Sequence, residues 1–180
     1  NEGYRLLERK RELLTRLVYE KLAEYRHLNS STREAFSKAY RWLGITQMRM
    51  GRNRIKQLAV GMPLAVEAKV VPKRDMSVQY PAVNIRKLPL SPVGILGTDA
   101  SLDETRSSFA DMVVKASKLA EVETALWRLL EEQRKTQKRV NALKHNVIPR
   151  YERTIKYIES SLEEEERNVL FQLKVLLQRS

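Results

Sequence analysis

Residues 119–147 read LAEVETALWRLLEEQRKTQKRVNALKHNV, and this stretch decides the fold. Apolar residues recur in it at seven-residue intervals, in two parallel series that also contain Gln133 and Thr136. The first series is Leu119, Leu126, Gln133, Val140 and Val147, and the second is Val122, Leu129, Thr136 and Leu143. Spacing sustained over several heptads predicts a long helix paired with another helix in a coiled coil. We call these two series together the seam, the face on which the paired helix would pack. Gln133 and Thr136 weaken this seam, and they also limit the alternative registers in which the two helices could pair.

Beyond Pro149 the same seam continues, but it is shifted by one residue. Apolar positions resume at Ile155, Leu162, Val169 and Leu176, and the step from Val147 to Ile155 is eight residues instead of seven. Pro149 has no backbone N–H to donate to the carbonyl of His145. We therefore expect a kink in the helix at this point.

The first part of the chain predicts a second long helix. Leucines, tyrosines and other apolar residues recur at helical spacing from Leu6 to Leu43. Ser31 and Glu34 match a capping box, which allows a break near Asn29, but the apolar spacing continues through it and favours one helix. Gly44 and Gly51 each weaken the helix by about 1 kcal/mol relative to Ala.

The segment between the two predicted helices is rich in helix breakers. Five of the six prolines and three of the six glycines lie within residues 61–97. Residues 65–71 and 76–80 alternate in polarity, and residues 73–75 form a plausible turn between them. This pattern predicts a β-hairpin at the far end of a two-helix rod. Because an isolated hairpin is marginally stable, it should pack on the rod or on a partner.

The predicted fold is therefore all-α, a long antiparallel two-helix coiled coil with a small β-hairpin insert. We expect a single elongated domain with an N-terminal helix over residues 1–58, a loop and hairpin over 59–98 and a C-terminal helix over 99–180. Residues 101–104 (SLDE) match a capping box at the start of the second helix. At about 1.5 Å per residue that helix outruns its partner by about 30 Å. Either its tip projects alone, or about twenty residues are missing before Asn1.

Composition narrows the class of protein. The 180 residues contain no cysteine, which excludes disulfides, cysteine-ligated metal sites and thiol catalysis. The longest uncharged stretch, residues 88–98, is too short to span a bilayer, and no signal peptide is visible. Asn1 is not methionine, so we expect the start to be missing or processed. The sequence predicts a soluble intracellular chain with no direct membrane insertion.

The net charge of +12 is unevenly distributed along the chain. Residues 1–60 hold 14 basic and 6 acidic residues, whereas residues 98–180 hold 15 basic and 14 acidic residues. The run RMGRNRIK at residues 49–56 carries four basic residues and no acidic residue. It could contact phosphates, but no aromatic residue is interleaved for base stacking. We favour a solvated helix face or one that meets an acidic protein surface, and we expect no nucleic acid partner.

Motifs for chemistry are absent from the sequence. There is no phosphate-binding G-x-x-x-x-G-K-[ST] loop and no G-x-S-x-G nucleophile elbow. His27 and His145 lie on different helices, and the four consecutive glutamates at 163–166 point around a helix rather than at one ion. The sequence predicts no catalytic residue, no cofactor and no metal site.

Several stretches resemble the D subunit of the V/A-type rotary ATPases. The most specific lie at residues 138–149 (KRVNALKHNVIP), 154–158 (TIKYI) and 162–174 (LEEEERNVLFQLK). Residues 3–11 (GYRLLERKR) and 90–94 (LSPVG) also resemble family segments. Glu8 stands where the family usually has a basic residue. The motif residues that carry the resemblance are Arg139, Asn141, Leu143, Pro149, Ile155 and Ile158.

The resemblance implies a non-catalytic central stalk, or rotor axle. It would transmit torque between ATP hydrolysis or synthesis in a hexamer of catalytic and regulatory nucleotide-binding subunits and proton or sodium translocation in a membrane ring. Further implied partners are a small rotor subunit, F, and a funnel-shaped subunit on the ring. The implied location is cytoplasmic, peripheral on the cytoplasmic face of the membrane.

The resemblance also suggests which residues contact these partners. Those expected at the hexamer bearing are Leu6, Lys10, Arg11, Glu163, Glu166, Arg167, Leu170, Phe171 and Lys174. Those expected to contact F or the membrane-end funnel are Arg49, Arg52, Arg54, Val66, Val70, Val78 and Tyr80. The alternative is a stand-alone basic coiled-coil scaffold that binds nucleic acid or anionic membrane, and its binding would be strongly salt-dependent.

Overall fold

The computed structural model describes residues 2–92 and 98–178, with side chains described up to residue 174. The chain divides into two compact units. One, the terminal unit, contains Asn1–Leu13 and Gln133–Ser180, and the other, the central unit, contains Leu14–Glu132. Two long helices, α1 and α3, contribute residues to both units.

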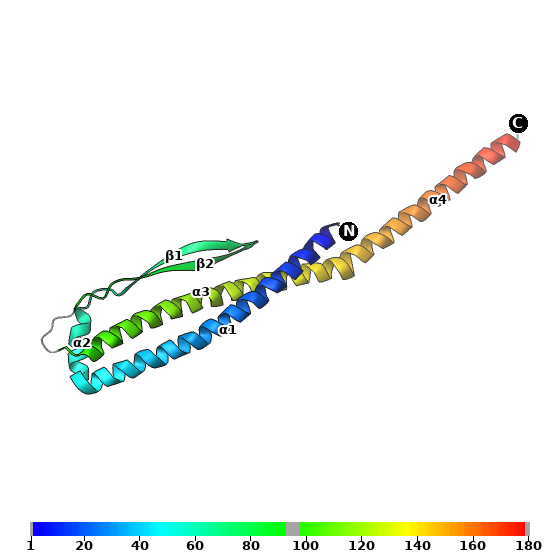
Figure 1. The fold of residues 1–180 in the computed structure, drawn as a ribbon. Helices are drawn as coiled ribbons and strands as arrows, with labels where there is room; N and C mark the ends of the chain where they lie inside the picture. The colour runs from blue at the N-terminus through cyan, green and yellow to red at the C-terminus, as the bar shows by residue number, and fades with distance from the viewer. Residues whose placement is uncertain (1, 93–97, 179–180) are drawn as a thin grey trace. The chain divides into compact units, whose positions relative to one another are not determined.

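The described chain is mostly helical with one antiparallel β-hairpin, as the sequence predicts (Figure 1). The elements in order are α1 Glu2–Met50, α2 Arg52–Val60, β1 Val66–Asp75, β2 Val78–Lys87, α3 Ala100–Ala142, the π-helix η1 Leu143–Val147 and α4 Ile148–Gln178.

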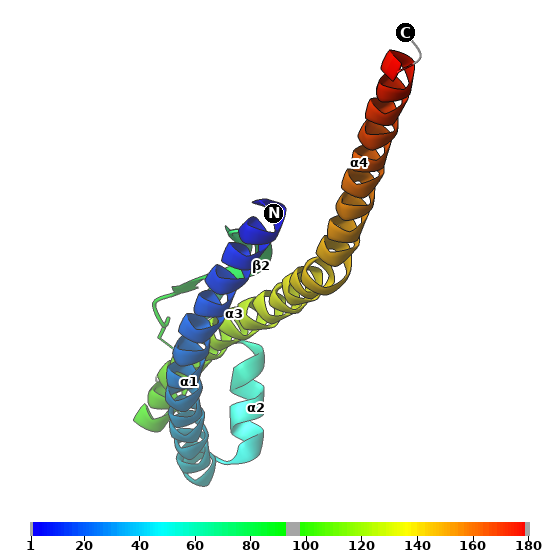
Figure 2. The ribbon, with the colours of Figure 1, turned by 90° about the vertical axis from the view of Figure 1, so that its right-hand side faces the viewer.

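Helix α1 passes without interruption through Asn29, so the favoured continuity is confirmed. The prediction of one helix to residue 58 is wrong at Gly51. This glycine has φ 80°, a left-handed conformation that ends α1 and that other residues adopt at a cost. The chain then starts α2, which leaves the end of α1 in a new direction (Figure 2).

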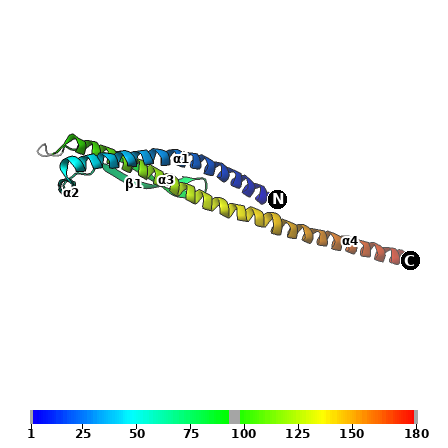
Figure 3. The same ribbon diagram turned by 90° about the horizontal axis from the view of Figure 1, so that it is seen from below.

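In the central unit, α1 and α3 pack against each other in antiparallel orientation (Figure 3). Near one end Thr46 Oγ1 lies 2.8 Å from Thr105 Oγ1. Farther along, Lys115 Nζ donates to the carbonyl of Ser31. Positions on α3 therefore rise as positions on α1 fall.

The central unit has two small clusters of buried apolar side chains. Leu14, Val78 and Leu129 join α1, β2 and α3 in the first cluster. The second contains the small residues Ala35 and Ala39 together with Met112. Small side chains let the two helices approach closely where the second cluster lies.

The hairpin differs from the prediction in two respects. Its strands are longer, and its turn is at Met76 and Ser77 instead of residues 73–75. Asp75 pairs with Val78, so two residues connect the strands, and Met76 takes a left-handed φ of 53°. Pro72 and Pro81 face each other within the ladder of paired strands. Because proline is uncommon inside a strand, these two residues made the strands look shorter in the sequence than they are and hid the position of the turn.

The sequence predicts a hairpin at the far end of a two-helix rod. In the structure, the hairpin instead runs back along α3. Three polar contacts hold β2 to the helix. Lys87 Nζ lies 2.7 Å from Asp111 Oδ1, the N–H of Val83 donates to Glu121 Oε2 at 3.0 Å, and Arg128 donates to the carbonyl of Gln79. The expected packing of the hairpin on the helices is thus confirmed, and it offsets the weakness of a two-stranded sheet.

Glu121 is the central one of these contacts. Burial by itself raises the pKa of this carboxyl, but the hydrogen bonds from Val83 N–H and Lys118 outweigh burial and lower the pKa. Lys118 Nζ lies 3.1 Å from Glu121 Oε2. The ionised carboxylate is therefore the form that binds the hairpin.

The helical path from Ala100 to Gln178 contains one irregular turn. The expected disturbance at Pro149 takes the form of the π-helix η1, which ends two residues before the proline. The N–H of Ile148 donates to the carbonyl of Leu143, five residues back instead of four. Before this turn, the buried positions of the predicted seam are Val122, Leu129, Thr136 and Val140.

Replacing Leu14 with alanine should lower the free energy of unfolding by about 2–5 kcal/mol, because the truncation leaves a cavity in the first apolar cluster. Leu14 is 0% exposed, whereas Leu6, on the same helix, is 69% exposed. Leu6→Ala is the matched control and should change stability by about 0.5 kcal/mol or less. Denaturant unfolding followed by circular dichroism measures both. Equal losses for the two variants would contradict the assignment of the core.

Glu121→Gln should destabilise the fold at neutral pH, and the difference from the unchanged chain should shrink in acid. A lowered pKa means that the carboxylate stabilises the folded state above its ordinary pKa of 4.5 and loses this effect as the pH falls through the folded-state value. Urea unfolding at pH 7 and at pH 3 tests this. The exposed change Glu123→Gln controls for the loss of a charge on α3, and an undiminished difference at pH 3 would refute the contact.

Candidate interaction surface

Helix α4 exposes a continuous stripe of apolar side chains. All of its side chains from Tyr151 to Lys174 are exposed. The apolar stripe consists of Tyr151, Ile155, Ile158, Leu162, Val169 and Leu173, at steps of three and four residues apart from one polar interruption at Glu165. Their exposed fractions lie between 50% for Ile158 and 65% for Tyr151. Apolar patches of this length on a protein surface mark places where another protein binds.

A second face of α4 carries the predicted bearing residues. We call it the mixed face, and it consists of Glu163, Glu166, Arg167, Leu170, Phe171 and Lys174, all exposed. At about 100° per residue these six positions fall within an arc of about 140° that begins about 50° from the centre of the apolar stripe. The structure therefore brings the six together on one face, separate from the stripe. Leu170 and Phe171 are each 67% exposed.

The three bearing residues predicted near the chain start lie on the first turns of α1. Leu6 is exposed, and Lys10 and Arg11 are half-buried. Glu8, the residue that departs from the family pattern, accepts a hydrogen bond from Tyr4 at 2.8 Å and lies 3.8 Å from Arg11. The hydrogen bond to Glu8 raises the pKa of Tyr4. Glu8 thus pairs within its own helix.

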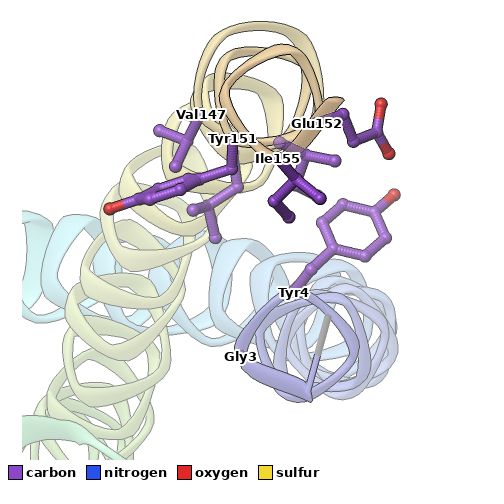
Figure 4. A pocket seen from close by; sticks show the side chains of 8 residues that line it. Gly3, Tyr4, Val147, Tyr151, Glu152 and Ile155 are labelled. Carbon is purple, nitrogen blue, oxygen red and sulfur yellow. The ribbon is translucent and has the colours of Figure 1, made fainter. Parts of the chain in front are cut away.

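A groove separates the first turn of α1 from η1 and α4 in the terminal unit (Figure 4). Its volume is about 400 Å³, and its lining is mostly apolar. The lining residues are Gly3, Tyr4, Leu143, Val147, Ile148, Tyr151, Glu152 and Ile155. Figure 4 shows Tyr4 on one side and Ile155 with Glu152 on the other. Sequence reasoning missed the groove, because nothing in the apolar spacing indicates that α1 begins opposite η1.

The motif residues of the family resemblance are placed around this groove or on the surface beside it. Leu143 and Ile155 line the groove, and Pro149 is half-buried next to it. Arg139 and Asn141 are exposed, and Asn141 Oδ1 accepts a hydrogen bond from Gln137 Nε2 at 2.9 Å. Ile158 belongs to the apolar stripe of α4.

At the other end of α1, a polar cluster joins the helices near the basic run. Arg49 donates to Asp99 Oδ2 at 3.0 Å, and Ser101 Oγ donates to the same oxygen at 2.6 Å. These two hydrogen bonds, that of Ser101 first, lower the pKa of Asp99. The capping box expected at residues 101–104 is wrong, because α3 already begins at Ala100 and the Ser101 side chain turns back to Asp99.

The basic residues of α2 are exposed. Arg52 and Arg54 lie on its surface, and Met48 and Val60 on either side are 82% and 91% exposed. No residue of α2 is buried. The helix is thus a solvated segment with positive charge and scattered apolar side chains.

The four predicted contact residues of the hairpin separate into two pairs. Val70 is 68% exposed and Val66 is half-buried, but Val78 and Tyr80 are buried in the central unit. The Tyr80 hydroxyl donates to Asp75, and burial followed by this hydrogen bond raises the pKa of Tyr80. Val78 and Tyr80 hold the hairpin to its own chain, and we leave them out of the proposed partner surface.

Within residues 2–92 and 98–178, the structure contains no group of three acidic, histidine or cysteine residues that could hold a metal ion. None of the helices described is long and apolar enough to cross a membrane.

Comparison with known proteins agrees with the sequence resemblance. The family of ATP synthase D subunits matches residues 1–178. The chain is 35% identical over 179 residues to the D subunit of the V-type ATP synthase of Thermotoga neapolitana, covering 99% of this chain and 88% of that protein. It is 34% identical over 179 residues to the D subunit of the A-type ATP synthase of Pyrococcus furiosus, covering 96% and 82%. For the A-type protein of Methanosarcina mazei the identity is 35% over 176 residues, covering 96% and 84%. The match to the family over nearly the whole chain and the identity to these relatives show that the chain belongs to the D-subunit family of V-type and A-type ATP synthases.

Proposed function

We propose that this chain is the non-catalytic central axle of a V/A-type rotary ATPase. It transmits torque between the nucleotide-binding hexamer and the ion-translocating membrane ring, on the cytoplasmic face of the membrane. The observation that carries this proposal is the exposure of two distinct faces on α4. A helix that is exposed on all sides yet carries an apolar stripe and a separate mixed face is suited to two different neighbours.

The apolar stripe is suited to helix pairing. Its steps of three and four residues are those of the a and d positions of a coiled coil, so a second helix laid along it would bury the exposed side chains. In the central unit, α1 and α3 also lie against each other in antiparallel orientation. Paired long helices resist bending and twisting, which an axle needs in order to transmit torque.

The mixed face is suited to a bearing inside the hexamer. A bearing turns past several orientations, so its contacts should be small apolar patches and long charged side chains rather than a deep socket. Leu170 and Phe171 provide the apolar patch, and Arg167 and Lys174 provide flexible charges beside it. Leu6, Lys10 and Arg11 extend this proposed contact to the start of α1.

The basic end of α1 and the exposed helix α2 are the proposed contact for the funnel-shaped subunit or for F. Arg52 and Arg54 present positive charge, and exposed Met48 offers an adaptable apolar contact. Val66 and Val70 add exposed or half-buried apolar area on the hairpin. An acidic surface on the partner would complement this charge.

Phe171→Ala combined with Lys174→Glu should weaken capture of the hexamer about tenfold or more, because it removes an aromatic contact and reverses a charge at the centre of the mixed face. Binding is measured with purified hexamer, and ATP-driven rotation is followed in the reconstituted complex. The matched control is Tyr157→Ala with Lys156→Glu, which makes the same changes at exposed positions nearer the start of α4. Unchanged binding and rotation in the first variant would refute the bearing.

Arg52→Glu with Arg54→Glu should weaken capture of the funnel-shaped subunit or of F, with a loss that diminishes at high salt because the contact is electrostatic. Arg26→Glu with Arg33→Glu makes an equal change of charge at exposed positions of α1 and serves as the control. Binding of each purified partner is measured at low and high ionic strength. If neither partner binds less well, α2 is not their contact.

A further inference from the structure

The irregular turn η1 lies where the spacing of apolar residues along the helix shifts by one residue. In the sequence, both seam series lengthen by one residue where they cross it, from Val147 to Ile155 and from Leu143 to Tyr151. In the structure, the backbone makes a hydrogen bond one residue longer at the same place, between Ile148 N–H and Leu143 O. The extra residue in the pattern and the extra residue in the turn therefore coincide.

We propose that η1 keeps the apolar face of α4 in line with the apolar face at the end of α3, because its wide turn holds one additional residue. Each residue of an α-helix turns the chain by about 100°. An eight-residue step in an unbroken α-helix would therefore rotate the apolar stripe of α4 by about 100° from the seam that precedes it. A π-turn takes up one residue within an α-helix and removes that rotation.

The groove in the terminal unit supplies an independent geometric check. Six of its lining residues, Leu143, Val147, Ile148, Tyr151, Glu152 and Ile155, lie at the two ends of η1 or beyond it. In an unbroken α-helix these six would spread over about 180°. With one residue taken up in the π-turn, they fall within about 120°, close to the width of one helix face. Figure 4 shows Ile155 and Tyr4 facing this groove from opposite helices.

Pro149 explains why the wide turn stays at this position. In an α-helix its ring would clash with the carbonyl of His145, four residues back, and that carbonyl would lack its donor. The wider π-turn moves the preceding carbonyls away from the ring. The proline therefore favours the π-turn immediately before itself, and the correction does not migrate along the helix.

The absence of cysteine from the chain makes a crosslinking test direct. Tyr4→Cys with Ile155→Cys places thiols on opposite sides of the groove, and a short bismaleimide should join them. Tyr4→Cys with Tyr157→Cys is the matched negative pair, because residue 157 is turned about 160° from residue 155. We expect the first pair to crosslink about fivefold or more faster than the second, since only the first shares a face with the groove.

The decisive comparison uses two deletions in the full chain that each remove one residue. Deleting Asn146 together with Pro149→Ala removes the extra residue and the proline, so a plain α-helix keeps the stripe in phase and the 4–155 crosslink should stay within about twofold of its original rate. Deleting exposed Arg153 with Pro149 retained should rotate everything beyond it by about 100° and reduce the same crosslink about fivefold or more.

Circular dichroism on each variant reports helix content in parallel with the crosslinking. The variant that lacks Asn146 has alanine, a better helix former, in place of Pro149, so the proposal requires this variant to fold. Its failure to fold, its loss of the 4–155 crosslink, or retention of that crosslink after deletion of Arg153 would each overturn the proposal. The readout is the internal geometry of the terminal unit, so the result is independent of whether the chain serves as a rotor axle.

Discussion

The packing of long amphipathic helices is the constraint on which this structure depends. A two-helix layer has little interior, so stability in the central unit comes from two small clusters, one with Leu14, Val78 and Leu129 and one with Ala35, Ala39 and Met112. The first cluster includes Val78 of the hairpin, so the hairpin is part of the core of the central unit. Its polar contacts along α3 also hold it to the helix.

Much of the architecture follows from periodicity alone. The heptad spacing predicts the second long helix and the buried positions Val122, Leu129 and Thr136, because a repeated apolar face is the face that a helix buries. The less regular apolar spacing of the first part of the chain predicts α1 and its continuity through Asn29. The cluster of prolines and glycines predicts the non-helical insert. The family resemblance, carried by the residues around Pro149 and the end of α4, is confirmed by the comparisons.

The features that sequence reasoning missed depend on single residues or on tertiary contacts. The end of α1 rests on the left-handed φ of Gly51, whereas the propensity of a glycine in a helix indicates only a modest cost. The hairpin turn rests on Met76 with a positive φ, which no turn preference predicts for methionine. Val78 and Tyr80 look like surface residues of a strand, but both are buried, and Val78 packs with Leu14 of α1 and Leu129 of α3.

The two faces of α4 differ in whether they need to be covered by another helix or protein. Both are read from spacing, and the structure leaves both exposed, so the helix itself supplies no reason for its apolar stripe. Such a stripe costs solubility unless something covers it, and a mixed face of charges around Phe171 does not need covering in the same way. The described helices leave this apolar stripe uncovered, so a further helix laid along it would bury it. The angular position of that surface then matters as much as its composition, because a partner helix can cover the stripe only if it stays in line along the whole contact.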